Sequence, residues 1–207
     1  MSDLIVISAP SGAGKTSLVQ AMVAKFDHLV ASVSHTTRKQ RDGEVHGEDY
    51  FFVSPQDFIS MRNENKFLEH AEVFGNLYGT SIDQIKTQQD KGFDVILEID
   101  WQGARNIRER MENVLSVFVL PPSFETLRER LVGRGQDDEE VINERMSAAA
   151  AEMSHFDEYE FLIVNDDFEA ACDDLAGILT QKWQNSTNLA TKIRSRYPSL
   201  IAEITNI

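Results

Sequence analysis

Short apolar runs alternate with longer helix-forming stretches along most of the chain. Four runs have the length and composition of buried strands: Leu4–Ser8, Val95–Asp100, Leu115–Leu120 and Glu160–Val164. Five helix-forming stretches lie between and after them: Lys15–Phe26, Gly103–Glu112, Phe124–Arg134, Glu139–Ser154 and Phe168–Asn185. Strands that alternate with helices predict an α/β fold, in which helices cover both faces of a central parallel sheet.

Residues 31–82 interrupt this alternation. Their strand-like stretches are shorter and more alternating, with turn signals at Asp42-Gly43 and Gly75-Asn76. A short helix from Pro55 to Asn65 is expected between them. The pattern predicts a small mixed α/β insertion beside the main sheet.

The second half of the chain adds a charged helical segment and a tail. The segment Pro122–Met153 predicts a mobile helical lid, and the tail predicts a last helix interrupted at Pro198. The tail either packs on the core or forms a subunit interface, and in the second case the protein would be a homo-oligomer. The predicted parts are a core of residues 1–32, 81–121 and 155–207, an insertion of residues 33–80, and a lid of residues 122–154.

Composition narrows the class of protein. The 207 residues, 42% of them hydrophobic, can bury one sizeable core, and no run approaches the roughly 20 apolar residues of a membrane span. No secretory signal is recognisable, so a cytoplasmic protein without a membrane partner is expected. The net charge of −14 argues against a general nucleic-acid binder, but it allows one phosphate ligand in a local basic pocket.

A glycine-rich loop follows the first predicted strand. Its residues are Ala9, Pro10, Ser11, Gly12, Ala13, Gly14, Lys15 and Thr16. The pattern G-x-x-x-x-G-K-[ST] fails only at Ala9, and loops of this kind bind phosphates through backbone N–H groups and the start of the next helix. Lys15 adds a full charge, and the Thr16 hydroxyl can ligate Mg²⁺. The strand before and the helix after the loop favour a phosphate site over a structural turn.

Two acids, Glu98 and Asp100, end the second main strand. Residues two apart in a strand point to the same face, and an acid at this edge commonly lies beside the Mg²⁺ of a phosphate loop. The sequence therefore predicts that Asp100 contacts Mg²⁺ through water, with a plain strand cap as the alternative.

Six segments, in this order, resemble guanylate kinases of the bacterial type: "ISAPSGAGKTSL", "SVSHTTRKQRDGEVHGEDYFFVS", "FLEHAEVFGNLYGTS", "EIDWQGARNI", "RLVGRGQD" and "FLIVNDD". The resemblance covers residues 4–184. It implies a P-loop kinase that uses Mg²⁺ and transfers the γ-phosphate of ATP to GMP, giving ADP and GDP in purine nucleotide metabolism. It also implies that dGMP is an acceptor.

The inserted region contains groups suited to guanine. A carboxylate such as Glu69 can accept from N1–H and the 2-amino group, while the hydroxyls of Ser34 and Thr80 can donate to O6. Adenine lacks this pair of donors, so AMP would leave the buried carboxylate unpaired. The resemblance assigns these three residues to the base, and the predicted site also includes Gly79, Glu98 and Asp100.

The inserted region also contains arginines and tyrosines suited to binding the acceptor phosphate. Arg38 and Arg41 suit bidentate phosphate contacts, and Tyr50 and Tyr78 add hydroxyl donors. The resemblance places all four at the GMP phosphate. Taken alone, the segment also fits a solvated basic loop beside packing tyrosines.

The remaining predicted residues concern ATP and the transfer step. Arg134 and Arg145 match the lid arginines of the family and are expected to act with Lys15 and Arg38. Ser17 and Asn165 complete the predicted ATP site, although the segment Asn165-Asp166 also fits a helix N-cap. Arg128 and Arg130 are interpreted as surface charges paired with Glu125 and Glu129.

Three other functions are compatible with parts of the pattern. A related kinase acting on a sugar bisphosphate would share the phosphate loop but would not need Glu69. A scaffold module that binds phosphopeptides would be expected to have an eroded loop. A regulatory GTPase would need an N-K-x-D segment, which this chain lacks.

Overall fold

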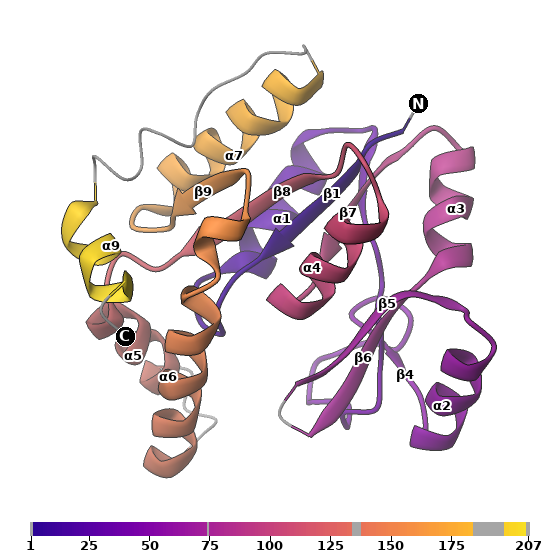
Figure 1. The fold of residues 1–207 in the computed structure, drawn as a ribbon, viewed down its shortest axis with the longest axis horizontal. Helices are drawn as coiled ribbons and strands as arrows, with labels where there is room; N and C mark the ends of the chain where they lie inside the picture. Colours follow the sequence, from indigo (N-terminus) through magenta and orange to yellow (C-terminus); the bar gives the residue numbers. More distant parts are fainter. Residues whose placement is uncertain (1, 74, 134–137, 184–196, 206–207) are drawn as a thin grey trace. The chain divides into compact units, whose positions relative to one another are not determined.

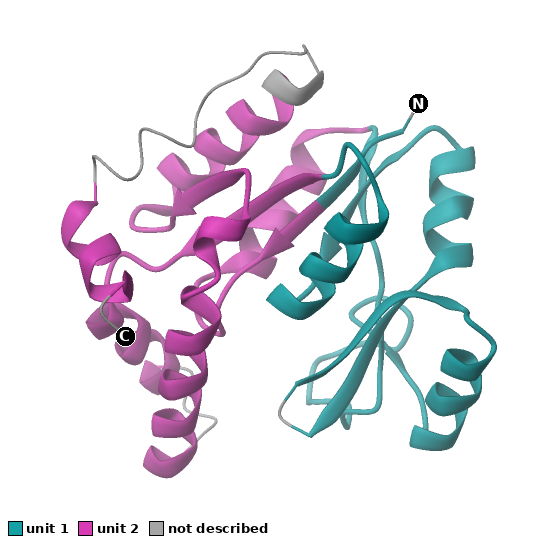
Figure 2. Cartoon of the chain, in the orientation of Figure 1, with its two compact units in different colours: residues 1–5, 28–114 teal, residues 6–27, 115–207 magenta. Residues whose placement is uncertain are grey.

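The computed structural model describes residues 2–73, 75–133, 138–183 and 197–205. Figure 2 shows two compact units, here called the first unit (residues 1–5 and 28–114) and the second unit (residues 6–27 and 115–207). The predicted division into core, insertion and lid stays a prediction.

Five strands form the main sheet (Figure 1). Their order is β2 (Leu29–Ala31), β7 (Asp94–Glu98), β1 (Leu4–Ser8), β8 (Leu115–Leu120) and β9 (Phe161–Val164). Every residue of β1, β8 and β9 is buried, which is why these strands are near-continuous apolar runs. The predicted α/β fold with a central parallel sheet is confirmed, while β2 is too short to stand out in the hydrophobic pattern.

The second unit contains five described helices and one 3₁₀ turn. They are α1 (Lys15–Lys25), α5 (Phe124–Gly133), α6 (Glu139–Met153), η1 (Phe156–Glu158), α7 (Phe168–Trp183) and α9 (Pro198–Thr205). Helix α1 packs on α7, and α5 packs on α6. Helix α9 begins at Pro198, where a proline fits the first helical turn, and the part of the tail before residue 197 lies outside the described residues.

The first unit holds a second, mixed sheet and three helices. The sheet order is β4 (Phe51–Phe52), β3 (His35–Thr36), β6 (Asn76–Ser81) and β5 (Phe67–Val73). The helices are α2 (Pro55–Asn63), α3 (Ile82–Asp90) and α4 (Trp101–Arg110). Helix α3 was not predicted because it buries only Ile85 and follows β6 without a turn signal.

The predicted turn at Asp42-Gly43 is present, but it does not join a hairpin. Strands β3 and β4 pair in parallel, with His35 opposite Phe51 and Thr36 opposite Phe52. Parallel neighbours need a crossover, so the chain between them forms a long loop. This loop carries Arg38.

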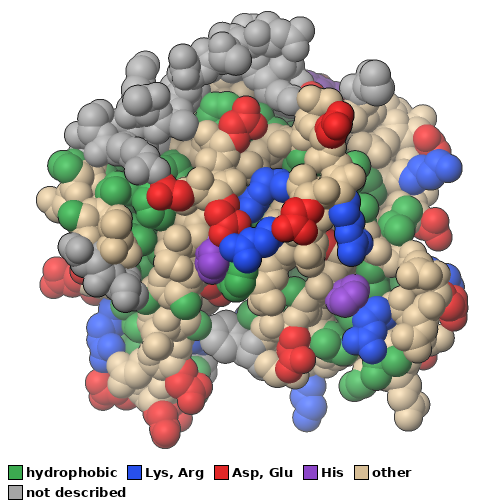
Figure 3. Space-filling view, viewed as in Figure 1, with side chains coloured by type: hydrophobic (Ala, Val, Ile, Leu, Met, Phe, Trp, Pro, Cys, Tyr) green, Lys and Arg blue, Asp and Glu red, His purple; other side chains and the backbone are tan. Residues whose placement is uncertain are grey.

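On the face shown in Figure 3, the described Lys and Arg side chains are interspersed with Asp and Glu side chains and form no continuous basic patch. Of the helices in the described ranges, none combines the length and apolar character needed to cross a membrane.

His35 lies in an aromatic cluster of the first unit. Its ring stacks on Phe51, with 4.9 Å between ring centroids, and meets the edge of Phe67 at 5.5 Å. The side chain is 8% exposed, and Nδ1 has no hydrogen-bond partner in the described part of the chain. Burial, followed by the charge of His46, lowers the pKa of His35.

Acidification is therefore expected to destabilise the fold through His35. The contribution of the neutral ring is complete above the unfolded pKa of 6.5 and is lost as the pH falls toward the lower folded pKa. The slope from one such group is at most about 1.4 kcal/mol per pH unit. Urea unfolding between about pH 5 and 7.5 should show a shallower pH dependence for His35→Phe, the remainder coming from His70, whose pKa burial also lowers. An equal slope in His35→Phe and the wild type would contradict the assignment.

Candidate active site

The glycine-rich loop connects β1 to α1 within the second unit. Gly14 is the N-cap of α1, with φ at +90°, and a Cβ at this position would overlap Nδ2 of Asn165. A Cβ on Gly12 would lie 2.9 Å from Cδ1 of Leu127 on α5. The loop thus rests directly on Asn165 and on α5, which leaves no room for larger residues at these two positions.

Asn165, directly after β9, fixes the orientation of the loop. Its buried side chain donates from Nδ2 to the carbonyl of Ala13 at 2.7 Å. Because C=O and N–H point in opposite directions in a trans peptide, this bond directs the Gly14 N–H away from Asn165. The N-cap alternative is wrong, since Asp167 caps α7 by accepting from Ala170 N at 2.9 Å.

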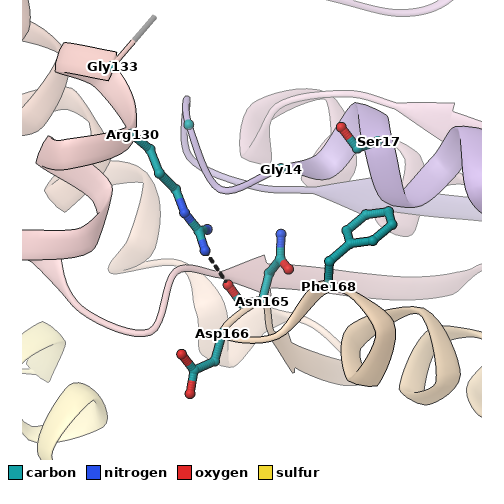
Figure 4. A pocket seen from close by; sticks show the side chains of 8 residues that line it. Gly14, Ser17, Arg130, Gly133, Asn165, Asp166 and Phe168 are labelled. Atoms are coloured by element: carbon teal, nitrogen blue, oxygen red, sulfur yellow. Dashed lines mark hydrogen bonds between the residues drawn. The ribbon is translucent and has the colours of Figure 1, made fainter.

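A cavity of about 480 Å³ lies beside the loop, a size typical of small-ligand sites (Figure 4). Its lining residues are Gly12, Gly14, Ser17, Arg130, Gly133, Asn165, Asp166 and Phe168. Phe168, 40% exposed, offers an aromatic surface on one side of Asn165, and Arg130 approaches from the other. The cavity thus combines an aromatic ring, a guanidinium group and the phosphate-type loop within one unit.

The interpretation of Arg130 as a paired surface charge is wrong. Arg130 donates from Nη2 to the Asn165 carbonyl at 2.8 Å, and its buried Nη1 has no hydrogen-bond partner within the described ranges. Arg130 shares a helix face with Leu127 and Leu131, which pack against Gly12 of the loop. This i, i+3, i+4 spacing could have indicated from the sequence that Arg130 faces the core side of α5 rather than solvent.

Arg128, in contrast, is exposed, but its partners differ from those predicted. It donates to Asn143 Oδ1 at 2.8 Å and to Glu139 Oε1 at 3.0 Å, both on α6. Arg128 therefore links α5 to α6, a contact between helices that helical spacing within α5 cannot indicate.

The other predicted ATP and lid residues have these positions. Lys15 and Thr16 form the first turn of α1, with Lys15 half-buried and Thr16 exposed. Arg145 is half-buried on α6. Arg134 lies outside the described residues.

A buried polar cluster forms in the mixed sheet of the first unit. Thr80 donates to Glu69 Oε1 at 2.5 Å, and the hydroxyls of Ser34 and Thr80 lie 3.4 Å apart. Glu69 is only 5% exposed. A register shift pairs Phe67 with Ser81 but Glu69 with Thr80, so this bulge brings the carboxylate directly opposite the hydroxyl.

A second cluster of the first unit surrounds Arg38. Its guanidinium donates to both carboxylate oxygens of Glu44, at 2.7 and 3.1 Å, and lies 5.4 Å from the ring centroid of Tyr50. The same carboxylate accepts from the Arg41 backbone N–H at 2.8 Å. The hydrogen bond from Arg38 lowers the pKa of Glu44. The sequence analysis did not identify Glu44. Its position three residues after Arg41, across a turn, could have indicated a carboxylate partner for the arginines.

Tyr50 and Tyr78 stand side by side in this cluster, with ring centroids 6.0 Å apart. Burial, followed by the charges of Tyr78 and Glu98, raises the pKa of Tyr50 to about 12. The Tyr50 hydroxyl therefore keeps its proton, and can donate a hydrogen bond, throughout the neutral and mildly alkaline range.

The predicted arrangement of Glu98 and Asp100 on one strand is wrong. Strand β7 ends at Glu98, and Asp100 is the N-cap of α4. Its Oδ1 accepts from Gly103 N at 2.9 Å, and its Oδ2 accepts from Gln102 Nε2 at 3.1 Å. The same-face argument fails because it assumed strand geometry for two residues beyond the end of β7.

Gly79 is buried at the edge of the Glu69 cluster. A Cβ there would lie 3.0 Å from atoms of Phe58 and Phe67, whose stacked rings have centroids 4.5 Å apart. The close packing of this glycine gives it a structural role, and its predicted contact with GMP stays a prediction.

Comparisons with known proteins give the family of this chain. The family model for guanylate kinase matches residues 1–182. The chain belongs to the guanylate kinase family. It is 58% identical over 177 residues to the guanylate kinase of Alkalilimnicola ehrlichii, covering 86% of this chain and 87% of the relative. It is 57% identical over 179 residues to the guanylate kinase of Escherichia coli K12, covering 85% and 86%.

A solved guanylate kinase has the same fold. The crystal structure of guanylate kinase from Anaplasma phagocytophilum matches with a TM-score of 0.71 and 35% identity, covering 95% of this chain and 96% of that one. The guanylate kinase family phosphorylates GMP with ATP, so the predicted enzyme class, an ATP:GMP phosphotransferase, is confirmed. The family match ends before α9.

A guanylate kinase uses ATP, and kinases generally need a divalent metal. Within the described ranges, no three His, Cys, Asp or Glu side chains come together as a metal site. Mg²⁺ is usually held by one or two protein oxygens together with substrate phosphates and water. The exposed Thr16 hydroxyl in the first turn of α1 fits this sparse requirement.

Proposed function

We propose that this chain transfers the γ-phosphate of ATP to GMP with one nucleotide held by each compact unit. The second unit would hold ATP and the first unit GMP. The observation that supports the proposal is that the candidate residues fall into different units. The loop held by Asn165, with its cavity, lies in the second unit, and the Glu69–Thr80–Ser34 and Arg38–Glu44 clusters lie in the first.

For ATP, the loop amides and Lys15 would bind the phosphates. The adjoining cavity would receive the adenosine, with Arg130 and Phe168 supplying flat surfaces suited to stacking a base. Thr16 would hold Mg²⁺, and the predicted contribution of Asp100 would be through water; the ion would supply neutralisation of the phosphate charge.

For the guanine base, the Glu69 carboxylate would accept from N1–H and the 2-amino group. Thr80 donates its only hydroxyl proton to Glu69, so Thr80 would position the carboxylate. Ser34 would then donate to O6. Gly79, Glu98 and Asp100 complete the proposed surroundings of the base.

For the GMP phosphate, Arg38, Arg41, Tyr50 and Tyr78 would provide donors. Glu44 holds Arg38 through two hydrogen bonds, which presents the guanidinium in a fixed direction. The proton retained by Tyr50 supports its role as a donor rather than a repelling phenolate.

The transfer step needs positioning and charge stabilisation rather than a covalent enzyme intermediate. An oxygen of the GMP phosphate attacks the γ-phosphorus of ATP, and the bond from that phosphorus to the β–γ bridging oxygen breaks, leaving ADP. Lys15, Arg38 and Arg145 would neutralise the charge that spreads over the transferring group, together with Arg134.

The proposal also concerns a second acceptor nucleotide, dGMP. Every role assigned here concerns the base or the phosphate of the acceptor, and dGMP, which shares both with GMP, is proposed as a further acceptor. A cytoplasmic setting and a homo-oligomeric state stay predictions from the sequence.

The Asn165→Ala variant tests the ATP half. Loss of the bond to Ala13 should free the loop peptide, raise the KM for ATP about fivefold and lower kcat, since one buried hydrogen bond contributes about 1 kcal/mol. Calorimetric titration with GMP should give the wild-type affinity. The control Asn143→Ala, an exposed asparagine on α6, should change neither. If Asn165→Ala weakened GMP as much as ATP, the two sites would not be separate.

A further inference from the structure

Glu69 lies against the first turn of α4. The α4 residue that faces its carboxylate is a glycine, Gly103. A Cβ built on Gly103 would lie 2.5 Å from Oε2 and 3.1 Å from Cδ of Glu69, and 3.3 Å from Oδ1 of Asp100. Real Cβ atoms do not approach an oxygen to 2.5 Å, so any side chain at this position would displace the carboxylate. Strand β5, which carries Glu69, packs on α4 within the first unit.

The stability of the helix gives no reason for a glycine here. Gly103 is the third residue of α4 and has no left-handed φ. A glycine inside a helix costs roughly 0.5–1 kcal/mol relative to alanine. The atoms that an added methyl group would meet belong to the ends of two side chains: Glu69, which would have to move away, and Asp100, whose Oδ1 at 3.3 Å needs only a small shift. An alanine should therefore be tolerated by the fold while changing the position of the Glu69 carboxylate.

We propose that Gly103 is a specificity-determining residue of the acceptor site. The absence of a side chain at Gly103 leaves room for Glu69 Oε2 beside the first turn of α4, while Thr80 donates to Oε1. The start of a helix also favours a negative charge. The ligand chemistry concerned is a purine with adjacent N1–H and 2-amino donors. This inference rests on the proposed role of Glu69 in reading guanine.

The Gly103→Ala variant should become a poorer enzyme and a protein of equal or greater stability. We expect the KM for GMP to rise about tenfold or more, because losing or bending one hydrogen bond to a charged group costs at least about 1.5 kcal/mol. The KM for ATP should not change. The preference for GMP over IMP, which lacks the 2-amino group, should shrink. Steady-state kinetics with GMP and IMP, together with Tm, give all four quantities.

Gly177 provides a matched control. It is a glycine within α7, and a Cβ there would meet nothing within 4 Å. Gly177→Ala should leave both KM values and the GMP preference unchanged. A Gly103→Ala variant with lowered Tm, or with equally raised KM values for GMP and ATP, would show a structural role and overturn the proposal.

A double-mutant cycle separates this inference from the function on which it rests. If Gly103 acts through Glu69, then Gly103→Ala should raise the KM for GMP in the wild type but add nothing in a Glu69→Ala background. Additive effects, or a selective effect of Glu69→Ala with none of Gly103→Ala, would overturn the role of Gly103 alone. No effect of Glu69→Ala on GMP would instead remove the proposed reading of guanine.

Discussion

Replacing Lys15 with alanine is expected to lower kcat about 1000-fold or more, because a single preorganised charge at a transferring phosphate contributes at least that much. Lys15 begins α1 directly after the loop, where its ammonium group can reach the outer phosphates. Lys15 is half-buried and lies outside the apolar core, so Tm should stay within about 2 °C of the wild type. A coupled assay of ADP formation with saturating GMP measures kcat, and thermal unfolding measures Tm.

Lys25 in the last turn of α1 is the matched control for Lys15. It is exposed and pairs only loosely with Asp173, at 3.7 Å. Lys25→Ala should retain wild-type kcat and KM values. A Lys15→Ala enzyme with near-normal kcat would remove the loop lysine from the mechanism.

Replacing Glu69 with alanine is expected to lower kcat/KM for GMP about 100- to 1000-fold, since two hydrogen bonds to a charged group are lost. The KM for ATP should stay close to the wild-type value, because Glu69 lies in the unit assigned to GMP. Discrimination against AMP should weaken, because AMP no longer leaves a buried carboxylate unpaired. Initial rates with GMP and AMP at several ATP concentrations measure these changes.

Glu72, an exposed carboxylate on the same strand, controls for the loss of charge. Glu72→Ala should behave as the wild type toward both nucleotides. Equal increases of the KM for GMP and ATP in Glu69→Ala would mean that Glu69 supports the fold rather than reading the base.

The main sheet and the phosphate loop were predictable because their signals are local. Parallel strands buried on both faces need continuous apolar runs, and the loop needs glycine at a position with positive φ, such as Gly14. The ends of elements were less predictable. Asp100 follows an apolar run, but the sequence does not indicate whether the chain is still a strand there or already caps a helix.

The parts that could not be predicted depend on contacts between distant segments. The parallel pairing of β3 with β4 leaves no period in the sequence, and the bulge that sets Glu69 opposite Thr80 is one unpaired residue in β5. The hydrogen bond from Asn165 to Ala13 of the loop joins residues that are 152 apart in the chain. Each of these contacts is fixed by packing, so local propensity cannot indicate it.

The central claim is that the first unit selects guanylate as the acceptor of a phosphate from ATP. The most direct test adds GMP, dGMP, AMP, UMP and ribose 1,5-bisphosphate separately to the purified protein with Mg-ATP, and follows ADP formation. Rapid ADP formation is expected with GMP and dGMP, and little or none with the other three. ADP formation with the sugar phosphate alone, or with none of the acceptors from a folded protein that still binds GMP, would contradict it.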